Sequence, residues 1–163
     1  MKKSKINVLT NIIVVVLLFS ALTDISAKKK PKFSGEWKFN VEESEVSPQM
    51  SFAPSSISIT QSKKEIKIVR KVNIQGENST ISENLMLDGS DSQSEGPMNS
   101  TMISNASWSD DKSSLVVVSK IQTDFGEFEN KLIYTLEDGK LKIQSLFTTN
   151  EGDMSETWVY DTE

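Results

Sequence analysis

Arg70 is the residue whose type and spacing best suit it for chemistry, because it is the only arginine among 163 residues. Apolar side chains alternate with it at Ile66, Ile68 and Val72, which predicts that its guanidinium faces a protein interior. A buried guanidinium could bind the carboxylate of a ligand, such as a fatty-acid head group, through two parallel hydrogen bonds. It could also pair internally with Glu83 on the neighbouring strand. We keep both interpretations and favour the internal pair.

Four other residues are soft or polar side chains on strands that are otherwise apolar: Glu83, Met102, Asn130 and Tyr134. Methionine adapts to irregular space, and a few inward polar groups can orient a bound molecule. We therefore predict that Arg70 and these four residues form a ligand-binding site. The alternative is a filled core, in which the polar groups pair with one another or with buried water.

The composition excludes most catalytic machinery, because the chain contains no histidine and no cysteine. It cannot form a Ser-His-Asp or Cys-His nucleophile, a zinc site of thiolate and imidazole ligands, or a disulfide. The acidic pairs Glu42-Glu43 and Asp110-Asp111 are adjacent in sequence, so their side chains diverge on a strand or lie in a turn. We predict that the protein is not an enzyme and has no cofactor.

Two kinds of binding are also disfavoured by the pattern of charges. The acidic residues of segment 88–97 lack the spacing of an EF-hand loop, so we predict no metal site there or elsewhere. The formal net charge of −5 provides no clustered basic surface, so we predict no nucleic-acid partner.

The segments around these candidate residues have the alternation of strands with one buried face and one solvated face. They are 33–41, 57–61, 65–75, 79–87, 98–108, 114–122, 127–136, 140–147 and 155–160. Short turns such as Asp88-Gly89 and Asp138-Gly139 separate neighbouring segments, which predicts antiparallel pairing. The fold class is therefore all-β: an up-and-down meander of 8–10 strands, closed into a barrel so that no edge is exposed.

Two segments do not fit the strand pattern. Segment 88–97 is rich in Ser, Asp and Gly and is predicted to be a mobile loop. Segment 42–56 contains Pro48 and Pro54 and is predicted to cover one end of the barrel as a loop or short helix.

The order of several short motifs resembles that of lipocalin-like (calycin-type) domains, in particular the small secreted bacterial ones. The motifs are Gly35-Glu36-Trp37 with Asn40, Ile59-Thr60-Gln61, Asp88-Gly89, Trp108-Ser109-Asp110 and Thr157-Trp158-Val159-Tyr160. The resemblance covers about residues 33–160 and implies a lipocalin-like barrel. It also implies that Trp37 packs at the closed end of that barrel, and no arginine after Arg70 is present to accompany it.

The first 27 residues have the order of a secretory signal peptide. Three lysines precede an apolar run from Ile12 to Leu22, and Ala27 occupies a plausible cleavage position. The apolar run is short for a membrane span, which needs about 20 residues. We predict a signal peptide at 1–27, a basic leader at 28–32 that acts as a disordered tether, and one barrel domain at 33–163, without a membrane span in the mature chain.

Together these features predict an exported protein, periplasmic or secreted, that binds a small hydrophobic or amphipathic ligand inside a lipocalin-like barrel. The alternative is a filled barrel that acts as a protein-interaction module of the cell envelope or extracellular space. The sequence does not name the ligand or a protein partner.

Overall fold

The computed structural model describes residues 29–163 except 49–50, 75, 98–99, 124–125 and 150–151. The predicted signal peptide lies outside the described residues. The strands are β1 (Gly35–Phe39), β2 (Ser56–Gln61), β3 (Glu65–Ile74), β4 (Glu77–Met86), β5 (Ser92–Glu95), β6 (Thr101–Trp108), β7 (Leu115–Thr123), β8 (Gly126–Glu137), β9 (Lys140–Thr149) and β10 (Gly152–Thr162). None of the described residues forms a helix that is long and apolar enough to cross a membrane.

The strands form one antiparallel sheet in the order β4-β3-β2-β1-β10-β9-β8-β7-β6-β5. The first and last strands of the chain are neighbours, with Trp37 opposite Thr162 and Phe39 opposite Tyr160. The two ends of this order, β4 and β5, lie against each other without a ladder of hydrogen bonds between their described residues. The predicted all-β up-and-down meander is thus confirmed, although the ring of hydrogen bonds around the barrel is incomplete between the described residues of β4 and β5.

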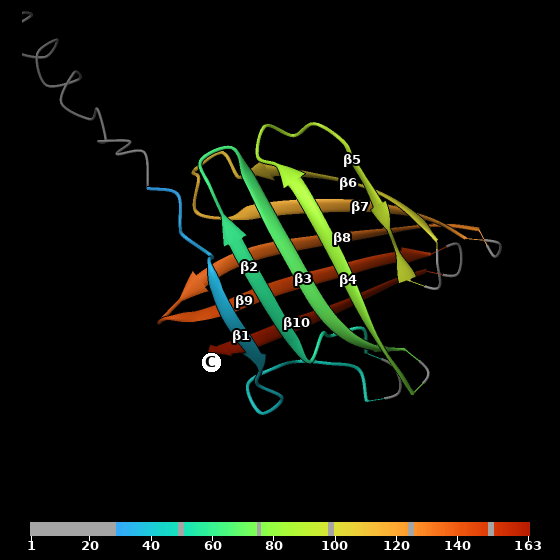
Figure 1. The fold of residues 1–163 in the computed structure, drawn as a ribbon. Helices are drawn as coiled ribbons and strands as arrows, with labels where there is room; N and C mark the ends of the chain where they lie inside the picture. The colour runs from blue at the N-terminus through green and yellow to red at the C-terminus, as the bar shows by residue number, and fades with distance from the viewer. Residues whose placement is uncertain (1–28, 49–50, 75, 98–99, 124–125, 150–151) are drawn as a thin grey trace, which may run out of the picture.

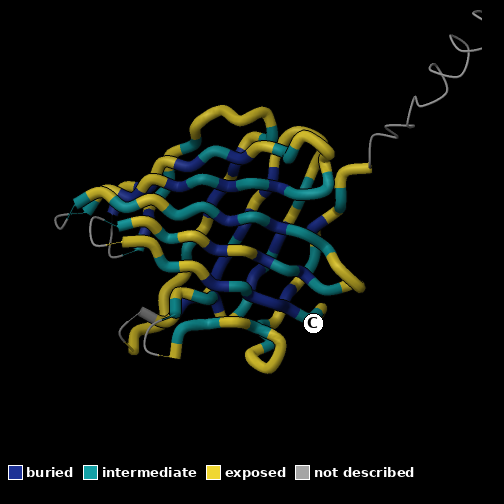
Figure 2. Tube along the Cα trace, turned by 180° about the vertical axis from the view of Figure 1, so that it is seen from behind, coloured by how far each residue is buried: buried dark blue, intermediate teal, exposed yellow. Residues whose placement is uncertain are grey.

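The barrel has two halves that face each other (Figure 1). Strands β1 to β4 cross obliquely over β6 to β10. Buried residues alternate with more exposed ones along the strands, whereas the connecting loops are exposed (Figure 2). This is the period of two that the apolar pattern predicts.

The core fills the barrel at the end that holds Trp37. Phe33 stacks on Trp108 with ring centroids 6.1 Å apart and contacts Tyr134 edge-on. The indole Nε1 of Trp37 donates a hydrogen bond to the carbonyl oxygen of Phe33, 2.9 Å away. Gly35 has a φ of 155°, a conformation that side-chain-bearing residues rarely adopt. Trp37 therefore packs within the core, as the sequence predicts.

The turn between β8 and β9 shows how local sequence sets the register of a hairpin. Asp138 and Gly139 both have positive φ, at 52° and 80°, and Glu137 pairs with Lys140 across them. Two central residues of positive φ define the two-residue hairpin turn in which Asp-Gly is favoured. The prediction of a tight turn at this site is confirmed.

The prediction of a loop throughout segment 88–97 is wrong in one part. Residues Ser92–Glu95 form β5, which pairs with β6 from Ser92 opposite Ser104 to Glu95 opposite Thr101. These residues include no apolar side chain, so alternation of hydrophobicity could not reveal the strand. It forms because the free edge of β6 offers backbone partners.

The described residues of segment 42–56 form no strand until β2 begins at Ser56. An isolated bridge joins Glu45 to Thr157, and the side chains of Phe52 and Pro54 reach the interior cavity described below. The segment thus covers one end of the barrel as a loop, and its described residues form no helix.

Candidate functional site

A cavity of about 280 Å³ lies inside the barrel, and Trp37 is not among its lining residues. Most of its wall is apolar and comes from β6, β7, β8, β9 and β10, including Met102, Ile121, Phe128, Leu132, Phe147 and Trp158. The barrel is therefore filled at the end that holds Trp37 and contains a cavity elsewhere, so of the two sequence interpretations the interior cavity is present and a filled core is not. Two larger depressions, of about 390 and 570 Å³, lie on the outer surface and are more polar.

Arg70 forms the charged part of the cavity wall and is buried. Its Nη1 pairs with Oε2 of Glu83, and its Nη2 donates a hydrogen bond of 2.6 Å to the hydroxyl oxygen of Tyr134. Glu83 lies on β4, next to the β3 strand that carries Arg70, whereas Tyr134 lies on β8. The internal pair that the sequence predicts is present, and Tyr134 joins it.

These contacts set the protonation states of the group. Burial lowers the pKa of the Arg70 guanidinium, but its interactions with Tyr134 and Glu83 outweigh that effect and leave the pKa above the ordinary arginine value. Burial raises the pKa of the Tyr134 phenol, because the phenolate would lose its hydration. Near neutral pH the group therefore consists of a guanidinium and a neutral phenol beside Glu83.

The five predicted site residues occupy two positions relative to the cavity. Arg70, Met102 and Asn130 line it. Glu83 and Tyr134 are buried behind the wall and reach it through Arg70. All five thus lie in or next to one region, although whether they bind a ligand stays a prediction.

The rest of the polar part of the wall consists of the uncharged residues Asn73, Ser119, Thr123, Asn130 and Ser145. Ser119 accepts a hydrogen bond of 2.9 Å from Ser104, and Ser145 donates one of 3.4 Å to Oδ1 of Asn130. The side-chain NH₂ of Asn130 has no hydrogen bond to another described residue. The cavity therefore presents neutral hydrogen-bonding groups beside one compensated cation.

Glu156 is a buried carboxylate that the sequence analysis missed. Its Oε1 accepts a hydrogen bond from the backbone N–H of Ser47 at 2.8 Å. Its Oε2 accepts two more, from the Ser51 hydroxyl at 3.0 Å and from the Trp158 indole N–H at 2.8 Å. Glu156 thereby fixes segment 42–56 to β10. The signal was present, because Glu156 has the same strand parity as Trp158 and Tyr160.

An aromatic row lies where this segment meets the cavity. Phe52 contacts Phe147 with ring centroids 5.1 Å apart, and Phe147 stacks on Phe128 at 5.8 Å. All three side chains line the cavity, and Phe52 is also exposed to solvent, with 40% of its surface accessible. The row thus connects the apolar interior to the surface.

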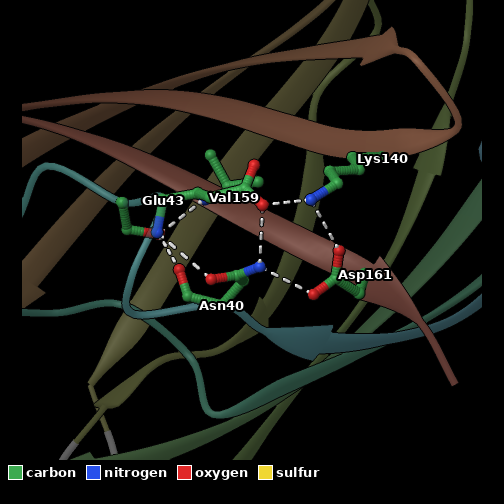
Figure 3. A network of polar contacts seen from close by, with 6 residues as sticks. Asn40, Glu43, Lys140, Val159 and Asp161 are labelled. Atoms are coloured by element: carbon green, nitrogen blue, oxygen red, sulfur yellow. Dashed lines mark hydrogen bonds and ion pairs between the residues drawn. The ribbon is translucent and has the colours of Figure 1, made fainter.

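A polar network attaches the beginning of the same segment to the barrel (Figure 3). The amide of Asn40 donates to Asp161 at 2.8 Å, and Lys140 pairs with both Asp161, at 3.2 Å, and Glu43. These hydrogen bonds lower the pKa of the Asp161 carboxyl and raise that of the Lys140 ammonium. The groups are solvated, so the network positions the loop and is not a buried site.

Part of the basic leader contacts the barrel. The ammonium of Lys30 lies 5.0 Å from the centre of the Trp108 ring, and the carbonyl oxygen of Pro31 accepts a hydrogen bond from Gln61. These residues therefore pack on the filled end, whereas the sequence predicts a disordered tether.

The arrangement of the strands is similar to that of known structures. No protein-family model and no curated protein sequence matches the chain. Solved structures do, at low identity. Lipid binding protein 8 of Caenorhabditis elegans, in its apo form, has a TM-score of 0.55 at 11% identity, over 80% of this chain and 95% of that chain. The fold is that of the lipocalin-like barrels.

Two further lipocalin-like structures extend the likeness. Zebrafish ileal bile acid-binding protein, complexed with cholic acid, has a TM-score of 0.55 at 13% identity, over 80% of this chain and 98% of that chain. The SAHS (abundant heat soluble) protein of Ramazzottius varieornatus has a TM-score of 0.56 at 11% identity, over 83% of this chain and 98% of that chain. At these identities the comparison establishes the barrel fold alone.

Proposed function

We propose that this lipocalin-like barrel is a non-catalytic binding protein that encloses a small hydrophobic or amphipathic molecule. The observation that carries the proposal is the cavity of about 280 Å³, which is mostly apolar and carries a few inward polar groups. Ligand pockets in proteins have this composition, and their volumes begin at about 300 Å³, so this cavity has the size of the smallest of them. Burial of apolar ligand surface would supply the affinity, at about 25 cal/mol per Å² before the costs of ordering.

The structural likeness supports the same proposal. Two of the similar barrels are described as a lipid binding protein and as a bile acid-binding protein complexed with cholic acid. A closed antiparallel barrel encloses space that a small ligand can occupy without any moving domain. Binding without catalysis is also consistent with a chain that has neither histidine nor cysteine.

Export is a further part of the proposal and rests on residues 1–27, with their lysines, apolar run and Ala27. Mass spectrometry of the protein purified from its source would test it. A chain that starts at Lys28 supports cleavage of a signal peptide, and a chain that retains these residues contradicts it.

The binding proposal predicts that filling the cavity abolishes ligand uptake. Val72 is buried and lines the cavity, whereas Val69 lies on the other face of β3. Val72→Trp should weaken binding of Nile red, an uncharged apolar dye, by about tenfold or more, which corresponds to about 1.4 kcal/mol. Val69→Trp is the matched control and should leave binding unchanged. Fluorescence titration measures both, with circular dichroism to confirm folding.

Three results would contradict the binding proposal. The first is an absence of Nile red binding by the wild-type chain, and the second is an equal effect of the two Trp substitutions. The third is a clean apo mass in native mass spectrometry of the protein from its source, combined with no response to a panel of apolar probes.

A further inference from the structure

The charge of Arg70 is already compensated within the protein. Arg70 is 6% exposed and Glu83 is 1% exposed, so their ion pair is almost completely removed from water. Tyr134 accepts a hydrogen bond from the second terminal nitrogen of the guanidinium. Each Nη atom therefore already donates one hydrogen bond within the protein, and Glu83 compensates the charge that would attract a ligand carboxylate.

A ligand carboxylate would also gain little from the field of this ion pair. Arg70 is the only charged side chain among the lining residues that the structure describes, and Glu83 behind it offsets most of its attraction for an anion. A carboxylate brought into this apolar cavity would lose its hydration and gain no uncompensated cation. An ammonium would lose its hydration as well and would be repelled by the guanidinium.

The polar atoms left over suit a neutral group. Nε of Arg70 and Oε1 of Glu83 are buried and have no hydrogen-bond partner among the described residues, but Glu83 lies behind the wall, so of these two residues only Arg70 lines the cavity. The amide NH₂ of Asn130, Ser119 and Ser145 provide further uncharged groups on the cavity wall. A hydroxyl or an amide can both donate and accept, so either could use such a wall without carrying charge.

We infer that the cavity selects an uncharged amphiphile, a molecule with an apolar body and a hydroxyl or amide end, over fatty acids and amines of the same length. The polar end lies toward Arg70 and Asn130, and the apolar body lies against Met102, Ile121, Leu132 and Phe147. This inference rests on the proposed function, because it specifies the ligand class of the same cavity.

The test compares three probes with the same apolar chain: decanol, decanoic acid and decylamine. Each probe competes with Nile red for the wild-type protein at neutral pH, and displacement of the dye measures its affinity. At this pH decanoic acid is an anion and decylamine is a cation. Decanol should bind about tenfold tighter than either charged probe, because an uncompensated buried charge costs more than a tenfold change in affinity.

The outcomes separate this inference from the proposed function. Equal or tighter binding of decanoate or decylamine overturns the preference for neutral ligands and leaves the binding function intact. Displacement of Nile red by none of the three overturns the inference as well. If Nile red itself does not bind, the proposed function fails, and the inference fails with it.

A single substitution should reverse the preference. Glu83→Gln keeps the shape of the side chain and removes its charge, which leaves the Arg70 guanidinium uncompensated beside the cavity. Affinity for decanoate should then rise about tenfold relative to decanol. Glu129→Gln removes the same charge from an exposed position on β8 and should change nothing. If folded Glu83→Gln protein has the same ratio of decanoate to decanol affinity as the wild type, the inferred preference for uncharged ligands is wrong. If the variant does not fold, the comparison of the three probes on the wild-type protein decides.

Discussion

At the scale of single residues, the ion pair of Arg70 and Glu83 is important because its two members depend on each other. Removing one partner of a buried ion pair leaves an uncompensated charge, whereas replacing both with apolar side chains often restores stability. Variants of the pair also distinguish two possible roles of Arg70: a structural cation, or a receptor for an anionic ligand.

We therefore predict that Arg70→Met lowers the free energy of unfolding by about 3–5 kcal/mol, because Glu83 stays buried without its cation. The double variant Arg70→Met/Glu83→Leu should regain most of that loss. Urea denaturation measures both variants. If the double variant is as unstable as the single one, the pair does not act as a unit, and the contact with Tyr134 gains importance.

The sequence reveals only part of this residue cluster. Arg70 and Glu83 lie on consecutive strands joined by a short turn, so strand parity was enough to place them together. Tyr134 is 64 residues further along and reaches Arg70 from the opposite half of the barrel. Its place on an apolar face was predictable, but its hydrogen bond depends on how the barrel closes.

At the scale of elements, segment 42–56 differs from the strands because side chains fix much of it in place. Glu156 accepts three hydrogen bonds, two of them from this segment. Its sequence, with Pro48 and Pro54, predicts a loop over one end of the barrel but not its attachment. That attachment uses β10, which is more than 100 residues away in the chain.

Glu156→Gln should therefore loosen the segment and destabilise the protein by about 1–3 kcal/mol, because an amide has one acceptor oxygen and must leave a buried donor unpaired. Hydrogen exchange at the Ser47 amide and urea denaturation would measure the two effects. Asp153→Asn, at an exposed position on the same strand, is the control and should change neither. Unaltered exchange at Ser47 would show that the segment is held by other contacts.

Strand β5 shows why some strands cannot be predicted from the alternation of apolar residues. The nine segments with apolar alternation all contain a strand of the structure, but Ser92–Glu95 has no buried apolar face. Its strand conformation comes from pairing with β6, a tertiary interaction that local composition does not record.

At the scale of the whole molecule, β4 and β5 each have a hydrogen-bonded neighbour on one side only. The sequence favours a closed barrel because closure protects edges, yet β4 and β5 lie next to each other without a ladder between their described residues. Half of the backbone groups of a strand point to each side, so about half of those on β4 point away from β3 and have no ladder partner among the described residues.

This arrangement predicts an uneven pattern of amide hydrogen exchange. Alternate amides of β4 should exchange much faster than their neighbours, because only those that point to β3 take part in a ladder. β7, which pairs with β6 and β8 along its length, is the internal control and should be protected at nearly every residue. Residue-resolved exchange by NMR would measure both strands. Uniform protection along β4 would mean that hydrogen bonds bridge it to β5 in solution, and the barrel would then be fully closed.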